Sequence, residues 1–205
     1  MNYSDVKYTP LFSSFIFSLK PHISMGDLKR EAYEIREKYE SIGVSNSGGY
    51  HSPRFHNEIG KPYLTELGEF LQDIATKFLQ DNNYQLEAKV TDWWVNINPQ
   101  YAYNVLHSHH AKSLIAIYYI EAIDSKSELI LLRNDGSMYT NLYTNLPQQL
   151  EFSVPCETGV LYILPGHLQH YVTANPSDNE RISVSFNIEC WDTSESGTEA
   201  VSSAS

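Results

Sequence analysis

The sequence predicts a mainly β protein with flanking helices, and two observations lead to this fold class. Before residue 88, apolar residues recur at three- and four-residue intervals in two segments, which is the spacing of one face of an α-helix. From Lys89 onward the chain divides into eight short strand-like segments with turn residues between them. Short strands in this number indicate an antiparallel sandwich or barrel. We expect a double-stranded β-helix, or jelly roll, with the N-terminal helices buttressing it.

The chain length of 205 residues suits one domain with a sizeable core and is short for two. We expect a single domain at residues 1–190, made of a helical part (1–88) and a jelly-roll core (89–190). The tail at 191–205 contains Ser, Thr, Glu and Ala without periodicity. Such a composition cannot bury enough apolar surface to fold, so the tail is predicted to be disordered.

The first elements are an edge strand and a helix. An apolar alternating run between Leu11 and Phe17 predicts the strand, which ends before Pro21. Ser24 with Asp27 indicates a helix start. The helix continues to about Glu40, because apolar residues recur on one side of it: Met25, Leu28, Ala32, Ile35 and Tyr39. Its charged residues mix both signs and are expected to form a solvated face: Lys29, Arg30, Glu31, Glu34, Arg36, Glu37 and Lys38.

A loop and a second helix follow. Residues 43–60 are rich in Ser, Asn, Gly and His, which is typical of a loop. The loop is either a lid that contacts substrate or a plain connection; as a lid it would offer Tyr50, His51, Arg54 and His56. Pro62 then opens a helix that ends near residues 81–83. Its apolar side holds Leu64, Leu67, Leu71, Ile74 and Phe78.

The remaining chain supplies the strands of the jelly roll. Each expected strand is a short run of apolar and β-branched residues bounded by turn residues. In chain order they are 90–98, 103–109, 114–122, 128–133, 150–154, 159–164, 170–173 and 181–189.

Histidines suggest a metal site. Side chains at i and i+2 of an extended strand share a face, so His107 and His109 can bind one metal ion. His170, at the start of another expected strand, is the best candidate for a third ligand. Three protein ligands that leave open positions describe a catalytic iron or zinc site. A single histidine is more often an ordinary core or surface residue, so the prediction depends on the pairing.

Two other histidines lie close to these in sequence. His110 should face away from its neighbours, as an outer or surface residue, unless a bulge turns it toward the metal. His167 precedes His170 by three residues and could also approach the metal. We expect His170 to be the ligand and His167 to line the mouth of the site.

Arg181 begins a strand in which Arg181, Ser183 and Ser185 share one face. An arginine that points into a barrel needs an anionic partner, because an unpaired buried charge costs several kcal/mol. A carboxylate ligand would supply that partner.

The order of these residues resembles the signature of Fe(II)- and 2-oxoglutarate-dependent oxygenases: His-x-(Asp/Glu/His), a distal His, and an Arg about ten residues later. More narrowly, the chain resembles a 2-oxoglutarate/Fe(II) oxygenase family found in phages and marine bacteria. The matching segments are 45–52, 94–98, 104–110, 117–120, 159–165 and 181–187.

This resemblance implies Fe(II) bound by His107, His109 and His170, with 2-oxoglutarate and O2 as cosubstrates. Arg181 would bind the distal carboxylate of 2-oxoglutarate, and Ser183 would add a hydroxyl donor. Related ligand sets more commonly have Asp or Glu where this chain has His109. A third neutral ligand leaves the site one unit more positive and bears on its metal preference.

The segment from Ile117 to Ile120 resembles the strand after the metal motif in prolyl 4-hydroxylases, in which the second tyrosine holds the same carboxylate. The resemblance carries this role to Tyr119; the alternative is an ordinary strand aromatic. Asn96 and Asn98 share a face and could donate to the proximal carboxylate or to substrate, with Asn104 and Asn187 as weaker candidates. The adjacent Trp93 and Trp94 should face opposite sides, one toward the core and one toward the pocket.

Charge and cysteine usage limit partners and location. A formal net charge of -11 with 14 basic residues argues against sequence-independent binding to the phosphate backbone of nucleic acids. A protein side chain or a small metabolite is therefore favoured over nucleic acid as substrate. The chain shows no signal-peptide pattern and no apolar run of membrane-spanning length. We expect a soluble cytoplasmic protein, phage-encoded by the resemblance, with Cys156 and Cys190 reduced.

The function predicted on these grounds is hydroxylation of an unidentified substrate, with 2-oxoglutarate converted to succinate and CO2. One alternative is a three-histidine, cupin-type metalloenzyme that does not use 2-oxoglutarate. The other is a non-catalytic jelly-roll binding module.

Overall fold

The computed structural model describes residues 14–56, 60–123, 126–132 and 151–192. In chain order the elements are β1 (Phe17–Leu19), α1 (Met25–Lys38), β2 (Asn46–Ser47), β3 (Tyr50–His51), α2 (Pro62–Asp81), β4 (Leu86–Asn98), β5 (Tyr103–His107), β6 (Leu114–Glu121), β7 (Glu128–Leu132), β8 (Glu151–Pro155), β9 (Leu161–Pro165), β10 (His170–Val172) and β11 (Arg181–Asp192).

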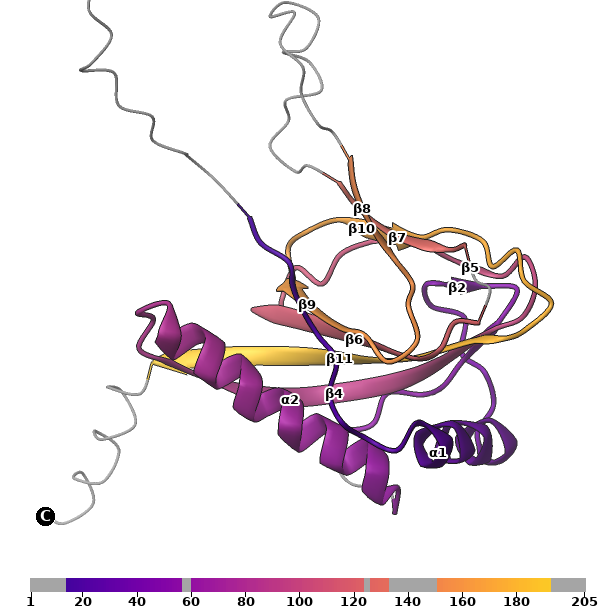
Figure 1. Ribbon diagram of the computed structural model, residues 1–205, viewed down its shortest axis with the longest axis horizontal. Coiled ribbons are helices and arrows are strands. Elements are labelled where there is room, and N and C mark those ends of the chain that lie inside the picture. Colours follow the sequence, from indigo (N-terminus) through magenta and orange to yellow (C-terminus); the bar gives the residue numbers. More distant parts are fainter. Residues whose placement is uncertain (1–13, 57–59, 124–125, 133–150, 193–205) are drawn as a thin grey trace, which may run out of the picture.

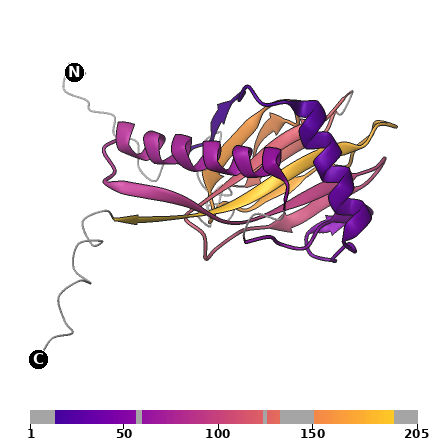
Figure 2. The same ribbon diagram turned by 90° about the horizontal axis from the view of Figure 1, so that it is seen from below.

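The strands form two antiparallel sheets. The six-stranded sheet has the order β1-β9-β6-β11-β4-β3, and the five-stranded sheet has the order β2-β5-β10-β7-β8. Figure 1 shows the sheets as two layers, with both helices on the outer side of the six-stranded sheet. Seen from below, α2 runs along β4 and β11, and α1 crosses the other end of the same sheet (Figure 2). The predicted mainly β fold with buttressing helices is therefore confirmed.

Alternation along β11 explains how one strand serves two layers. Its even-numbered residues are fully buried in the core beneath the helices: Ile182, Val184, Phe186 and Ile188. Its odd-numbered residues point between the sheets: Arg181, Ser183, Ser185 and Asn187. An apolar cluster from Ile115, Leu129, Leu164 and their neighbours fills the rest of that inner space. One end of the space between the sheets is thus left for polar residues.

Glu31 corrects the predicted solvated face of the first helix. Its side chain is buried, and its carboxylate accepts hydrogen bonds from the backbone N–H groups of Tyr63 and Leu64. N–H groups in the first turn of a helix have no carbonyl partner within the helix, and the N-cap residue of α2, Lys61, makes no side-chain cap. Glu31 therefore fastens one helix to the start of the next.

Several boundaries differ from the predictions. β4 begins at Leu86, four residues early, because it pairs with β11 as far as Asp192. Trp191 and Asp192 therefore belong to a strand rather than to the predicted tail. The predicted loop at 43–60 contains the short strands β2 and β3. β5 ends at His107, two residues before the predicted end.

Some predictions fall outside the described residues. These are the apolar pair at 11–12, the disorder of 193–205, and the strand residues 133 and 150. Within the described ranges, neither helix has the length and apolar character to cross a bilayer. Cys156 and Cys190 are free thiols, as expected. A cytoplasmic location stays a prediction.

Candidate active site

Three imidazoles meet between the sheets. His107 ends β5, His170 begins β10, and the two residues are paired across these strands. Their ring centroids are 4.4 Å apart, and the ring of His109 lies 5.2 Å from His107 and 5.4 Å from His170. The potential ligand atoms of the three residues all lie within 4.8 Å of one another. The histidines that the sequence grouped are thus together in space.

His109 is not positioned by the predicted strand alternation, because β5 ends at His107. Its backbone N–H donates to the carbonyl of Gly166 over 2.8 Å, and its carbonyl accepts from Lys112 N–H, which closes a turn. Gly166 permits this approach: a Cβ at that position would meet the Lys112 carbonyl oxygen at 2.3 Å. The turn, rather than strand alternation, directs the His109 ring toward the other two.

The same nitrogen of each ring is occupied by an acceptor. Nδ1 of His107 lies 2.7 Å from the Val105 carbonyl, and Nδ1 of His170 lies 2.9 Å from the Leu168 carbonyl. Nδ1 of His109 lies 2.6 Å from Oδ1 of Asn187. Carbonyl oxygens only accept, so Nδ1 carries the proton in all three rings. Each Nε2 therefore keeps its lone pair free for a metal ion.

Burial keeps these rings neutral. Desolvation lowers the pKa of His170 to about 3, with a further contribution from His107. It lowers the pKa of His109 to about 4, partly opposed by the hydrogen bond to Asn187. The pKa of His107 is lowered for the same reason. Neutral imidazole is the form that binds metal ions, so the cluster is ready for one at physiological pH.

Arg181 lies in the same inner pocket as the histidines. It is only 2% exposed, and it donates to the Thr173 carbonyl over 2.9 Å and to Oδ1 of Asn104 over 3.2 Å. Among the residues that the structure describes, no carboxylate forms an ion pair with it. A buried guanidinium that meets only neutral acceptors leaves a positive charge for an anionic ligand.

Tyr119 and Ser183 stand beside Arg181 in this pocket. The Tyr119 side chain is 1% exposed, and its hydroxyl has no hydrogen-bond partner among the described residues. Burial raises the pKa of this hydroxyl well above its usual value, and the neighbouring Cys156 thiol raises it further. Buried hydroxyls are normally hydrogen-bonded, so this donor, like Arg181, is available to a polar ligand.

Some of the asparagines with predicted site roles line the inner pocket. Asn96 and Asn104 line the inner pocket. Asn98 is not among the lining residues of that pocket, and it exchanges hydrogen bonds with Asn46, over 3.1 and 3.4 Å. Trp94 lines the pocket, whereas its neighbour Trp93 packs in the helix-side core, as alternation predicts.

An outer pocket of about 330 Å³ opens next to the cluster. It shares Ser45, Trp94, His107 and His109 with the inner pocket. The loop after residue 43 contributes His51, whose ring stacks on Trp94, and Arg54, whose guanidinium lies 5.2 Å from the Trp94 ring centroid. This arrangement suits a chamber through which a substrate reaches the metal.

Four residues with predicted site roles lie elsewhere or at the rim. Tyr50 donates its hydroxyl to the Tyr39 carbonyl, and His56 lies against the Thr91 carbonyl. His110 lines the outer pocket and pairs with the Ser108 hydroxyl, consistent with an outer position. His167 is exposed and lines neither the inner nor the outer pocket, so it does not line the mouth as predicted.

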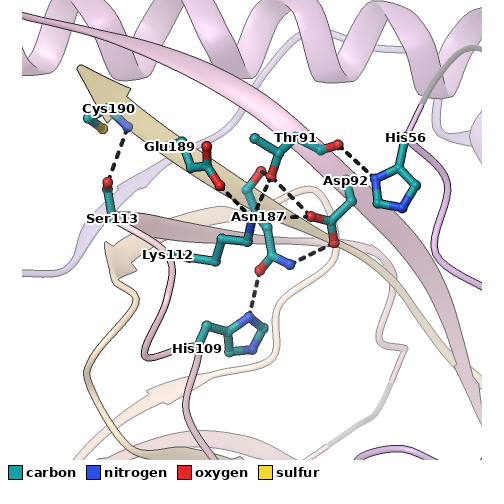
Figure 3. Close-up of polar contacts among 9 residues, drawn as sticks. All are labelled: His56, Thr91, Asp92, His109, Lys112, Ser113, Asn187, Glu189 and Cys190. Atoms are coloured by element: carbon teal, nitrogen blue, oxygen red, sulfur yellow. Dashed lines mark hydrogen bonds and ion pairs between the residues drawn. The ribbon is translucent and has the colours of Figure 1, made fainter. Parts of the chain in front are cut away.

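Sequence reasoning missed Asp92. Its carboxylate is buried and accepts a hydrogen bond from Nδ2 of Asn187, the residue that contacts His109 (Figure 3). The alternation that places Trp94 and Asn96 on the inner face of β4 also places Asp92 there. That signal was present in the sequence.

Comparisons with known proteins agree with this geometry. Residues 92–187 match the family described as "Putative 2OG-Fe(II) oxygenase". The three histidines, Arg181 and Tyr119 all lie within the matched segment. No curated protein matches the sequence.

Solved structures of low sequence identity share the fold. A Pseudomonas putida prolyl-4-hydroxylase is 14% identical, over 84% of this chain and 91% of that one, with a TM-score of 0.58. A Trichoplax adhaerens prolyl hydroxylase, in complex with a hypoxia inducible factor peptide fragment, is 12% identical over 92% and 87%, with a TM-score of 0.61. The viral collagen prolyl hydroxylase of Paramecium Bursaria Chlorella virus-1, in complex with 2OG, is 13% identical over 84% and 94%, with a TM-score of 0.56. Residues 92–187 are therefore similar to the 2OG-Fe(II) oxygenase family, whose members are dioxygenases with Fe(II), 2-oxoglutarate and O2 as cofactors, and the solved structures share the fold of this chain.

Proposed function

We propose that the protein hydroxylates a C–H bond of its substrate while 2-oxoglutarate is converted to succinate and CO2. One observation carries the proposal: a pocket between the sheets holds three neutral imidazoles together with a buried guanidinium that has no carboxylate partner among the described residues. The first group suits a divalent metal, and the second suits a dicarboxylate that also reaches this metal.

His107, His109 and His170 would hold Fe(II) through their free Nε2 atoms. The donor set fits the ion, because imidazole is a ligand for iron and three protein ligands leave room for the cosubstrate and O2. When bound, Fe(II) supplies the redox chemistry that activates dioxygen. The protein would position the reactants, and the buried apolar side chains of Ile115 and Ile117 in the lining of the inner pocket would limit the access of water.

Arg181 would bind the distal carboxylate of 2-oxoglutarate, with further hydrogen bonds from Tyr119 and Ser183. Two charge-assisted bonds from a planar guanidinium fix the orientation of a carboxylate, which a lysine could not do. Asn96 is the residue of the inner pocket that we assign to the proximal carboxylate or to the substrate.

The substrate would enter through the outer pocket. Its volume of about 330 Å³ is at the small end of ligand pockets and accommodates one protein side chain or a small metabolite. Trp94 and His51 offer aromatic surfaces there, and Arg54 offers a charge. We therefore favour these two substrate classes over nucleic acid.

The test is to add Fe(II) and 2-oxoglutarate without oxygen and to record the weak visible charge-transfer band of the bidentate complex. The wild-type protein should show the band. Arg181→Ala should lower the affinity for 2-oxoglutarate, read from the same band, about 10- to 100-fold, because a hydrogen bond to a charged group contributes about 1.5–3 kcal/mol. Arg54→Ala is the matched control: it removes an arginine from the outer pocket only and should leave the band unchanged.

Absence of the band in the wild-type protein would contradict the proposal. Metal binding without 2-oxoglutarate affinity, and without any effect of Arg181→Ala, would instead favour a three-histidine enzyme that uses no oxo acid. Less than about a tenth of an equivalent of metal after reconstitution would favour a binding module.

A further inference from the structure

Asp92 is a buried carboxylate that the proposed reaction does not use. Its residue is 3% exposed, in the interior face of β4. Burying an ionised carboxylate costs several kcal/mol unless it is paired and hydrogen-bonded. Among the described residues, Asp92 forms an ion pair with Lys112 at 3.8 Å, and this lysine makes a closer ion pair, at 2.7 Å, with the exposed Glu189. Because Lys112 lies closer to Glu189, its ion pair with Asp92 does not explain why the Asp92 carboxylate is buried.

The hydrogen bonds of Asp92 lead to the metal cluster. Oδ1 accepts from Nδ2 of Asn187 over 2.7 Å, and Oδ2 accepts from the Thr91 hydroxyl over 3.0 Å. Oδ1 of Asn187 is then 2.6 Å from Nδ1 of His109. Figure 3 shows the resulting line from the carboxylate through the amide to the imidazole.

Chemistry determines the direction of each hydrogen bond in this line. The Asp92 carboxylate accepts only, so the amide NH2 of Asn187 must face it. The amide oxygen must then face His109, and Nδ1 of that ring must donate. The line allows one tautomer of His109, in which Nε2 has the free lone pair.

The strand geometry holds this line in place. Asn187 and Asp92 are directly opposed across β11 and β4, and the register shifts immediately afterwards, at Ile188, so Thr91 is left out of the pairing. Such a bulge re-aims side chains and is frequent beside active sites. It brings the Thr91 hydroxyl to the second oxygen of Asp92.

His109 differs in this respect from the other two members of the cluster. His107 and His170 donate Nδ1–H to backbone carbonyls, whereas His109 donates to a side chain that is itself bound to a carboxylate. His109 also occupies the position at which related ligand sets more commonly have Asp or Glu. The ligand set contains no carboxylate, but the Asp92 carboxylate lies behind it, separated from His109 by the side-chain amide of Asn187.

We propose that Asp92, acting through Asn187, is the positioning carboxylate of the metal site: it holds His109 in the ligating tautomer and strengthens its imidazole as a donor. This inference rests on the proposed function, since it assumes that His109 binds the metal. Residues that hydrogen-bond a metal-binding histidine orient its ring and raise its basicity. Their loss typically lowers metal affinity 10- to 100-fold.

The test measures binding of Co(II) alone, by its visible absorption, to the full chain. Asp92→Asn preserves the shape of the side chain and an acceptor oxygen for Asn187, removes the charge, and places an NH2 group beside the Thr91 hydroxyl. It should weaken Co(II) binding about 10- to 100-fold. Glu189→Gln makes the same change in charge close by, on an exposed carboxylate that also contacts Lys112, and should change the affinity less than about fivefold.

A double variant separates the electrostatic role from a structural one. Combining Asp92→Asn with Asn187→Asp exchanges the two groups, so the carboxylate accepts directly from His109 Nδ1–H and the new amide donates to it. Co(II) affinity should return to the wild-type value or exceed it. Thermal melts of both variants check folding, and the double variant carries the test if Asp92→Asn alone does not fold.

The outcomes are distinct. If the wild-type protein binds Co(II) and Asp92→Asn binds it equally well, the inference is overturned and the proposed function stands. Equal loss of affinity in the single and double variants would show that Asp92 serves only the fold, and would also overturn it. Failure of the wild-type protein to bind Co(II) would overturn the metal site and this inference together.

Discussion

Tyr118 and Tyr119 are adjacent in β6 and equally buried, yet they face opposite sides of the six-stranded sheet. Tyr118 belongs to the core under the helices, and Tyr119 faces the inner pocket. Neither hydroxyl has a hydrogen-bond partner among the described residues. An unsatisfied buried hydroxyl costs about 1–3 kcal/mol, so each tyrosine needs a reason to be there. For Tyr119, a bound dicarboxylate would provide one.

The two tyrosines form a matched pair for mutagenesis. Tyr119→Phe should raise the Kd for 2-oxoglutarate about tenfold, because it removes a hydrogen bond to a charged group. Tyr118→Phe should leave that Kd unchanged. Isothermal titration with Fe(II)-loaded protein, kept anaerobic, measures both.

Stability provides a second readout of the same pair. Without ligand, both substitutions should raise the midpoint of thermal unfolding, since each removes an unsatisfied polar atom while the ring stays packed. A lowered midpoint for Tyr119→Phe would indicate that its hydroxyl already has a structural partner, which would count against the role proposed for it.

The turn after β5 decides where His109 points, and Gly166 decides whether the turn can form. The strand before it ends at His107, and the chain from β9 passes so closely that a Cβ on Gly166 would lie 2.9 Å from the His109 carbonyl oxygen. Both close contacts are with backbone, which cannot rotate away as a side chain can.

Gly166→Ala should therefore displace the His109 turn and lower Co(II) affinity at least tenfold, by analogy with the loss of other residues that orient a ligand. Gly68→Ala is the control. The added methyl group in α2 would meet only the Phe186 ring at 3.6 Å, an ordinary contact, and alanine favours helix by about 1 kcal/mol. Unchanged Co(II) affinity in Gly166→Ala would mean that the turn is not what positions His109.

The histidine cluster also makes the stability of the entire domain depend on pH. The folded-state pKa of His170 is about 3, below the ordinary value of 6.5. Between pH 6.5 and pH 3 the unfolded chain binds a proton that the folded chain excludes. The free energy of unfolding therefore keeps its full value above pH 6.5 and decreases as the pH falls below it. One such ring lowers the free energy of unfolding by about 1.4 kcal/mol for each pH unit below 6.5.

Metal-free protein should consequently lose stability between pH 6.5 and 5, measured as the free energy of unfolding in urea. His170→Gln should show a shallower dependence on pH in this range, and His110→Gln, at an exposed position, should keep the wild-type dependence. Identical curves for the wild type and His170→Gln would contradict the buried, neutral state of this ring.

Local pattern was sufficient for much of this protein. Helical spacing of apolar residues located α1 and α2, and alternation placed Ser183 on the same face as Arg181 and put Trp93 and Trp94 on opposite faces of their strand. These predictions succeed because the position of a side chain relative to its own helix or strand depends on neighbours a few residues away. The grouping of His107, His109 and His170 also came from the sequence, although part of the reasoning about His109 was wrong.

Other features depend on contacts between distant segments. The turn at His109 requires Gly166, and Glu31 is buried because α2 begins against it. A helical pattern cannot distinguish a charge that faces water from one that faces another helix.

The sequence by itself determined the fold class and the two helices, and it predicted the residues that we propose bind a metal and a dicarboxylate. Only the tertiary structure decided that Asp92 lies behind His109 and that Asn98 exchanges hydrogen bonds with Asn46. The physical reason is that strand alternation specifies a face but not what stands opposite it. Asp92 and Asn187 are 95 positions apart in the chain, and only the antiparallel register of β4 and β11 makes them neighbours.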